Sequence, residues 1–127
     1  MPLKLSLRDG EKIVINGTVM RSIGRTEISV ETPGQILRGR DIMPPEAATT
    51  PCRRLYFHTM MAYVDQENVE QHQQRIVDAL AEVTRTCPGP ETMSAAIEFA
   101  ERVATFQYYK ALASCKKLME LNEENGG

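Results

Sequence analysis

The residues best suited to chemistry in this chain are cations in its first third. Arg38 and Arg40 lie two residues apart in a segment expected to be a strand, so both side chains should project from one face. Arg8 closes the expected first strand, and Lys4 lies four residues earlier on the same face. If the first and fifth strands are neighbours, the four cations form a basic stripe. Arginine binds phosphate in bidentate fashion and stacks on bases, so the pattern predicts RNA binding. A solvated outer sheet face is the alternative.

A second candidate RNA-binding cluster is Arg53-Arg54, although these two residues could equally cap a helix or pair with acidic helices. Charge is distributed unevenly along the chain. Residues 1–54 hold nine Lys/Arg and six acidic residues, a net charge of +3, whereas residues 55–127 have a net charge of −5. The asymmetry indicates that any nucleic-acid contact lies in the first half.

Signals for other function classes are poor. The sequence has no nucleophile elbow, P-loop or dinucleotide-binding glycine motif, and His58 and His72 lie fourteen residues apart without a nearby Cys or Asp cluster. Cys52, Cys87 and Cys115 are widely spaced, which favours reduced, partly buried thiols. No apolar run approaches the ~20 residues of a spanning helix, and no signal peptide is evident. We therefore expect a cytoplasmic protein that is not an enzyme and has no cofactor, metal site or membrane contact.

The first 43 residues are expected to form a five-stranded antiparallel β unit. Leu3, Leu5 and Leu7 alternate with polar residues, which is the period of a half-buried strand. Asn16-Gly17 between apolar runs predicts a hairpin with a type I′ turn. A further strand is expected at 27–31, and the fifth at 35–42.

Residues 44–49 contain paired prolines and are expected to form a linker, followed by three or four helices over 50–123. Thr50 should cap the first of these helices, with Pro51 at its first position. Apolar stripes are expected to lie on the buried sides of the later helices, including one from Met93 to Val103 and one from Tyr109 to Met119. The predicted fold class is therefore α+β.

Aromatic side chains in the helical part are the candidate protein-interaction residues. A chain of 127 residues has a small core, and aromatic residues are enriched at interfaces. The alternative is that these aromatics simply form the core. The candidates are Tyr56, Phe57, Tyr63, Tyr108 and Tyr109.

Several stretches, in order along nearly the whole chain, resemble the FlbT family of flagellum biosynthesis regulators. The N-terminal stretches are Pro2 to Lys12 with Ile15-Asn16-Gly17, and Ile36-Leu37-Arg38 with Asp41-Ile42-Met43. The most specific stretch is Thr50 to Phe57, with Met61-Ala62-Tyr63. The last are Tyr108 to Leu112 and Lys117-Leu118-Met119.

The resemblance implies a regulator, by expectation a repressor, that binds the 5′ untranslated region of flagellin messenger RNA and controls its translation or stability. It also implies a small partner, FlaF. A protein-interaction adaptor that acts with FlaF and flagellin is the alternative function.

The first 43 residues also resemble CsrA, a small RNA-binding translational regulator. The shared features include Gly10-Glu11, Ile13-Val14-Ile15 and the end of the basic last strand, Arg40-Asp41-Ile42. This chain departs from CsrA in placing Gly39 at the position of the key arginine of CsrA. CsrA proteins are intertwined dimers that bind RNA with the edges of strands one and five, so the resemblance implies a homodimer formed through the β half. Unpaired strand edges in a small sheet also favour pairing with a second chain.

Overall fold

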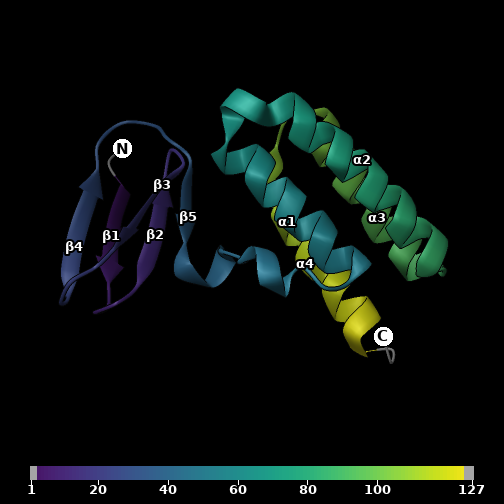
Figure 1. Cartoon of the computed structure of the whole chain (residues 1–127), viewed down its shortest axis with the longest axis horizontal. Coiled ribbons are helices and arrows are strands. Elements are labelled where there is room, and N and C mark those ends of the chain that lie inside the picture. Colours follow the sequence, from purple (N-terminus) through teal and green to yellow (C-terminus); the bar gives the residue numbers. More distant parts are fainter. Residues whose placement is uncertain (1–2, 125–127) are drawn as a thin grey trace. The chain divides into compact units, whose positions relative to one another are not determined.

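The computed structural model describes residues 3–124, with side chains described through residue 122. Five antiparallel strands precede four α-helices in this range, which confirms the predicted α+β class (Figure 1). The strands are β1 (Leu3–Leu7), β2 (Lys12–Ile15), β3 (Thr18–Arg21), β4 (Thr26–Val30) and β5 (Ile36–Arg38). The helices are α1 (Pro51–Val64), α2 (Val69–Thr86), α3 (Pro90–Ala104) and α4 (Tyr108–Glu124), with short 3₁₀ turns at Gly39–Asp41, Pro45–Ala47 and Gln66–Asn68.

The chain divides into two compact units, which we call the β unit (up to Ile42) and the helical unit (from Met43 onward). In the β unit, β1 pairs with β4, and β2 lies between β3 and β5 in a second sheet. Leu5, Leu7 and Ile13 form a buried cluster, which joins a strand of one sheet to a strand of the other. The two sheets therefore share one hydrophobic core.

The hairpin between β2 and β3 follows the sequence prediction. Asn16 and Gly17 both have positive φ, at 50° and 83°. Positive φ at both central residues is the requirement of a type I′ turn, whose twist matches that of the flanking strands. The turn brings Lys12 of β2 opposite Arg21 of β3.

One feature of the predicted sheet is wrong, and the condition for the full basic stripe is not met. The fifth strand ends at Arg38 rather than at Ile42, because Gly39–Asp41 form a 3₁₀ turn. In addition, β1 and β5 are not neighbours, because β1 pairs with β4 in one sheet and β5 pairs with β2 in the other. Alternating apolar residues specify which face of a strand is buried but leave open which strands pair.

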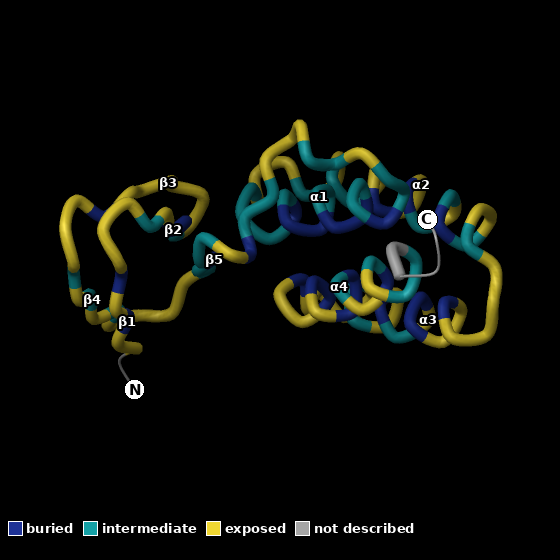
Figure 2. The backbone as a smooth tube through the Cα atoms, turned by 90° about the horizontal axis from the view of Figure 1, so that it is seen from below, coloured by how far each residue is buried: buried dark blue, intermediate teal, exposed yellow. Residues whose placement is uncertain are grey.

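The helical unit is built on α1, which packs against both α2 and α4, while α3 packs on α4. The segment has the predicted cap, since the Thr50 hydroxyl accepts the Arg53 backbone N–H and Pro51 occupies the first turn. Leu55 on α1, Val83 on α2 and Leu118 on α4 are fully buried. Figure 2 shows buried positions gathered on the sides of the helices that face one another.

The predicted buried face of α3 is rotated from the observed one. Phe99 and Ala95 are buried, whereas Met93 and Ile97 are 48% and 53% exposed. The apolar residues of α3 cover about half of the helix circumference, so periodicity alone admits either flank. Phe99 is the largest fully buried side chain, and its burial fixes which flank faces α4.

The three cysteines are free thiols. Cys52 and Cys115 are buried and Cys87 is partly buried. Burial raises the pKa of the Cys115 thiol well above its ordinary value. Within the described residues, no helix is both long enough and apolar enough to cross a bilayer.

We expect Thr50→Ala to lower the free energy of unfolding of the helical unit by about 1 kcal/mol, because it leaves a backbone donor of the first turn without its side-chain acceptor. Thr49→Ala is the matched control, since Thr49 is exposed and precedes the cap. Urea unfolding followed by helical circular dichroism measures both variants. Equal midpoints for the two would contradict the capping role.

Candidate nucleic-acid interface

A tight turn after β1 brings together the residues of the candidate site. The Glu11 backbone N–H donates to the Arg8 carbonyl at 3.0 Å, and Gly10 between them has a φ of +81°. The Glu11 carboxylate also folds back to accept the Arg8 backbone N–H at 3.1 Å. The turn therefore places Arg8 at the end of β1 close to Lys12 at the start of β2.

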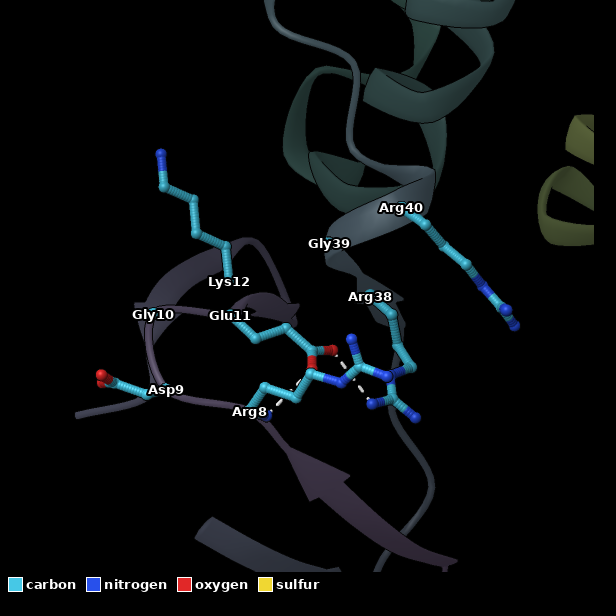
Figure 3. Close-up of a pocket in the computed structure, with 8 residues that line it drawn as sticks. All are labelled: Arg8, Asp9, Gly10, Glu11, Lys12, Arg38, Gly39 and Arg40. Atoms are coloured by element: carbon cyan, nitrogen blue, oxygen red, sulfur yellow. Dashed lines mark hydrogen bonds and ion pairs between the residues drawn. The ribbon is translucent and has the colours of Figure 1, made fainter. Parts of the chain in front are cut away.

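Arg38 at the end of β5 is anchored to this turn (Figure 3). Its guanidinium donates to the Ser6 carbonyl at 2.6 Å and to the Glu11 carboxylate at 3.0 Å. The Arg8 backbone N–H, and then the Arg38 guanidinium, lower the pKa of Glu11 below its ordinary value. Glu11 thus holds two cationic residues in place through its two oxygens.

An open hollow of about 730 Å³ lies over this turn and the 3₁₀ turn after β5. Its charged lining consists of the cations Arg8, Lys12, Arg38 and Arg40 and the acids Asp9 and Glu11. We call this feature the basic hollow. Arg25 lines an adjoining hollow that shares Arg8 and Arg38 with the first.

Both carboxylates at the basic hollow are engaged within the protein. Asp9 accepts the Gly24 backbone N–H at 2.8 Å, and Glu11 is bound to Arg8 and Arg38. Among the described residues, the side chains of Arg8, Lys12 and Arg40 have no hydrogen bond or ion pair. Figure 3 shows Lys12 and Arg40 extending away from the turn. The hollow therefore presents unneutralised positive charge, which suits phosphate groups.

Gly39 allows β5 and its 3₁₀ turn to approach β2 closely. A Cβ atom at this position would lie 3.2 Å from the Lys12 carbonyl oxygen. That separation is tighter than ordinary contact, so a side chain here would displace one wall of the basic hollow. Gly39 is therefore held in place by backbone packing, with Arg38 and Arg40 on either side in the sequence.

The predicted basic stripe is only partly assembled. Arg8, Arg38 and Arg40 line the basic hollow, but Arg40 lies on the 3₁₀ turn rather than on a shared strand face with Arg38. Lys4 is exposed on β1 opposite Ser29, and it is not a lining residue. The structure thus brings three of the four predicted cations together. The turn after β1 and the ion pair of Arg38 with Glu11 position them, and no pairing of β1 with β5 is involved.

Lys12 and Arg25 are the lining cations that the sequence analysis missed. A signal for Lys12 was available, since a two-residue Asp9-Gly10 turn necessarily brings the residues on its two sides together. Arg25 carried no such signal, because its approach depends on the pairing of β1 with β4.

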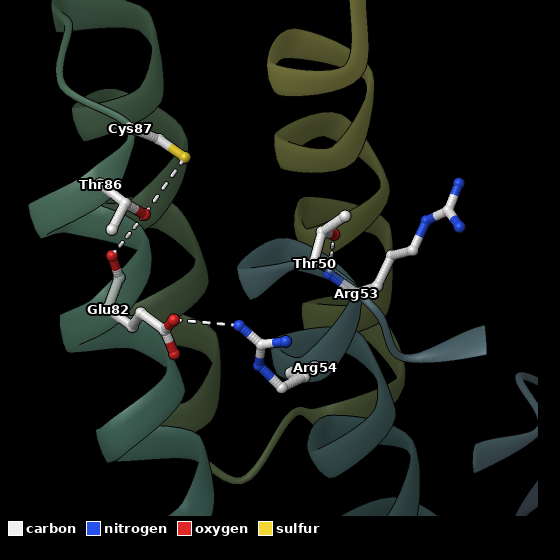
Figure 4. Close-up of polar contacts among 6 residues, drawn as sticks. All are labelled: Thr50, Arg53, Arg54, Glu82, Thr86 and Cys87. Carbon is white, nitrogen blue, oxygen red and sulfur yellow. Dashed lines mark hydrogen bonds and ion pairs between the residues drawn. The ribbon is translucent and has the colours of Figure 1, made fainter. Parts of the chain in front are cut away.

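The second predicted cluster belongs to the helical unit (Figure 4). Arg54 forms an ion pair with Glu82 of α2 at 2.9 Å, and the Arg53 backbone N–H donates to the Thr50 cap. Pairing with an acidic helix was the alternative raised from the sequence, and Arg54 follows it. The pair is partly exposed, so it contributes little to stability.

The candidate protein-interaction residues differ in exposure. Tyr56 and Tyr108 are buried in the helical unit, Phe57 and Tyr63 are partly buried, and Tyr109 is 52% exposed. Tyr63 and Tyr109 pack with ring centroids 5.4 Å apart. Of these five residues, only Tyr109 is more than half exposed, whereas Tyr56 and Tyr108 follow the alternative of core residues.

The chain matches the family model described as "Flagellar protein FlbT" over residues 3–125. The chain belongs to the FlbT family. A relative from Caulobacter sp. (strain K31), named "Probable flagellum biosynthesis repressor protein FlbT", is 38% identical over 128 aligned residues that cover 100% of this chain and 98% of the relative.

Two other FlbT family members have similar coverage. The "Flagellum biosynthesis repressor protein FlbT" of Caulobacter vibrioides (strain ATCC 19089 / CIP 103742 / CB 15) is 38% identical over 100% of this chain and 91% of the relative. The "Probable flagellum biosynthesis repressor protein FlbT" of Rhodopseudomonas palustris (strain TIE-1) is 31% identical over 98% of this chain and 97% of the relative. No solved structure matches the chain, so the likeness to CsrA stays a prediction.

We expect the Glu11→Gln variant of this FlbT family member to be less stable than wild type at neutral pH, with the difference vanishing in acid. Glu11 has a lowered pKa in the folded chain. Its contribution is therefore complete above the ordinary glutamate pKa and is lost as pH falls through the folded value. Thermal unfolding across pH measures this difference. Glu27→Gln is the control, because Glu27 is exposed on β4. A stability difference between Glu11→Gln and wild type that persisted at the lowest pH would contradict the ion-pair origin.

Proposed function

We propose that this chain is a repressor of flagellum biosynthesis that binds the 5′ untranslated region of flagellin messenger RNA and lowers its translation or lifetime. The repressor role is supported by the names of the relatives. The observation that supports RNA as the ligand is the basic hollow. Among the residues that the structure describes, the side chains of Arg8, Lys12 and Arg40 have no hydrogen bond or ion pair there, and both neighbouring carboxylates are engaged.

Phosphate binding at such a site has a measurable signature. Each phosphate that a cation neutralises releases condensed counterions, so the logarithm of affinity falls linearly with the logarithm of salt concentration. For single-stranded RNA, the slope is about −0.7 per neutralised phosphate. A site with three unpaired cations and a partly engaged Arg38 should therefore give a slope of roughly −2 to −3.

The direct test is filter binding of wild-type protein to flagellin leader RNA, with a scrambled leader of the same length and composition as control. We expect tighter binding to the leader and the stated salt slope. A reporter gene that carries the leader should fall in expression when the protein is supplied. Equal affinity for the two RNAs, or no retention of either at low salt, would reject the proposal.

A second candidate function is an adaptor that acts with FlaF and flagellin through the helical unit. It is favoured by five large apolar side chains of the helical unit that are 48–71% exposed, namely Val77, Met93, Ile97, Phe106 and Tyr109. Exposed apolar groups of this size are typical of protein-interaction surfaces when they are contiguous. Protein that retains no RNA at low salt but co-elutes with FlaF or flagellin would favour this function over the first.

The homodimer stays a prediction. Its motivation in the structure is the two-stranded sheet, in which β1 and β4 each have one edge without a strand partner among the described residues. Light scattering is expected to give twice the monomer mass of 14.3 kDa. A monomer mass across a wide concentration range would exclude the dimer.

A further inference from the structure

The outer strand of the three-stranded sheet carries apolar side chains that the protein itself does not cover. Val19 and Met20 on β3 are 64% and 40% exposed, and Ile23 just after β3 is 93% exposed. Together they line a shallow hollow with Lys12 and Arg21. We call Val19, Met20 and Ile23 the apolar ledge.

The cations that border the apolar ledge are in an unfavourable arrangement without a ligand. Lys12 lies directly opposite Arg21 in the antiparallel register of β2 and β3. Like charges in directly opposite positions destabilise a sheet. Among the described residues, neither side chain has an acidic partner. An anion bound between the two would remove this repulsion.

Lys12 lines both the hollow beside the apolar ledge and the basic hollow, so one cation borders each. On the other side of the apolar ledge, Met20 and Ile23 form the rim of an apolar hollow of about 300 Å³, whose floor includes Leu7 and Ile13. A groove with phosphate-binding groups on one side and an apolar surface beside them fits a nucleotide chain whose bases are turned outward.

We propose that the apolar ledge binds an unpaired nucleobase of the RNA, with the adjoining phosphate held between Lys12 and Arg21. The inference rests on the proposed function and specifies its ligand as a single-stranded segment. A base inside a duplex is stacked and cannot lie on the ledge, whereas an unpaired base exposes its flat face. The surplus of cations around the ledge favours RNA over a second copy of this chain, which would bring the same cations to the contact.

The test compares an unstructured RNA oligonucleotide with the same oligonucleotide annealed to its complement, using the full chain. The ledge variant is Val19→Thr with Ile23→Thr, because threonine retains strand propensity and removes apolar surface. We expect about fivefold weaker binding of the single strand, which is the lower end of the range for loss of base stacking on aromatic side chains, because the ledge is aliphatic. Binding of the duplex and the salt slope should be unchanged, since the phosphate contacts persist.

Leu3→Thr is the matched control, because Leu3 is 48% exposed on β1 in the other sheet. Ile23→Ser alone, in an exposed turn, provides a variant that cannot disturb the β2–β3 hairpin. Unchanged single-strand affinity in both ledge variants, with wild type binding normally, would overturn the ledge proposal alone. A ledge variant that changed the solution mass instead of RNA affinity would assign the surface to a second copy and also overturn it. Wild type that bound neither RNA form would reject the proposed function together with the ledge.

Discussion

The double variant Arg8→Glu, Arg40→Glu should bind flagellin leader RNA roughly a hundredfold more weakly than wild type, if each residue contributes at the low end of the range for hydrogen bonds to charged groups. Both side chains line the basic hollow, and neither has a hydrogen bond or ion pair within residues 3–124. Their replacement therefore removes phosphate contacts without removing a structural bond. The salt slope should also become shallower by about 1.4, the value for two phosphates on a single strand.

Arg75→Glu with Arg85→Glu is the matched control for this experiment. Both arginines are exposed on α2, so the control makes the same change of net charge in the helical unit. Filter binding at several salt concentrations measures both double variants. If they weakened binding equally, overall charge rather than the basic hollow would determine affinity, and the assignment of the site would be wrong.

Truncation of Phe99 should give the largest loss of stability among single substitutions in the helical unit. Phe99 is fully buried, and it lies on α3, which packs mainly on α4. Phe99→Ala should lower the free energy of unfolding by about 3–5 kcal/mol, because it removes apolar contact and leaves a cavity. Chemical denaturation followed by helical circular dichroism measures the change.

Met93→Ala on the same helix provides the contrast, since Met93 is 48% exposed and should change stability by less than about 0.5 kcal/mol. The comparison decides which flank of α3 is buried. Should Met93→Ala prove the more damaging variant, α3 would be rotated toward the flank that carries Met93 and Ile97.

Local features of the fold were predictable because they depend on neighbouring residues. The Asn16-Gly17 turn and the Thr50 cap were predicted and occur. Of the predicted alternating residues Leu3, Leu5 and Leu7, the last two are buried, whereas Leu3 at the start of β1 is 48% exposed. Each depends on backbone preferences or on a period of a few residues, which a single sequence contains.

The features that could not be predicted from the sequence are those that depend on tertiary packing. Alternation does not encode which strands pair, so the sequence left open whether β1 and β5 are neighbours, and Arg25 was overlooked. At the early end of β5, Gly39 closely approaches the Lys12 carbonyl of the neighbouring β2. This approach cannot be predicted without knowing that β2 and β5 pair. The candidate site was therefore predicted in its residue types, while its geometry had to come from the structure.

The reactivity of the buried thiols can be used to follow transient opening of the helical unit. The Cys115 thiol is fully buried and its pKa is raised, so alkylating and oxidising reagents should find almost no thiolate in the closed state. Modification must then wait for transient opening, and its rate measures how often the helices separate. The partly buried Cys87 at the end of α2 should react first and serve as an internal reference. Mass spectrometry of timed alkylation would thus follow opening in the native protein, without an engineered label.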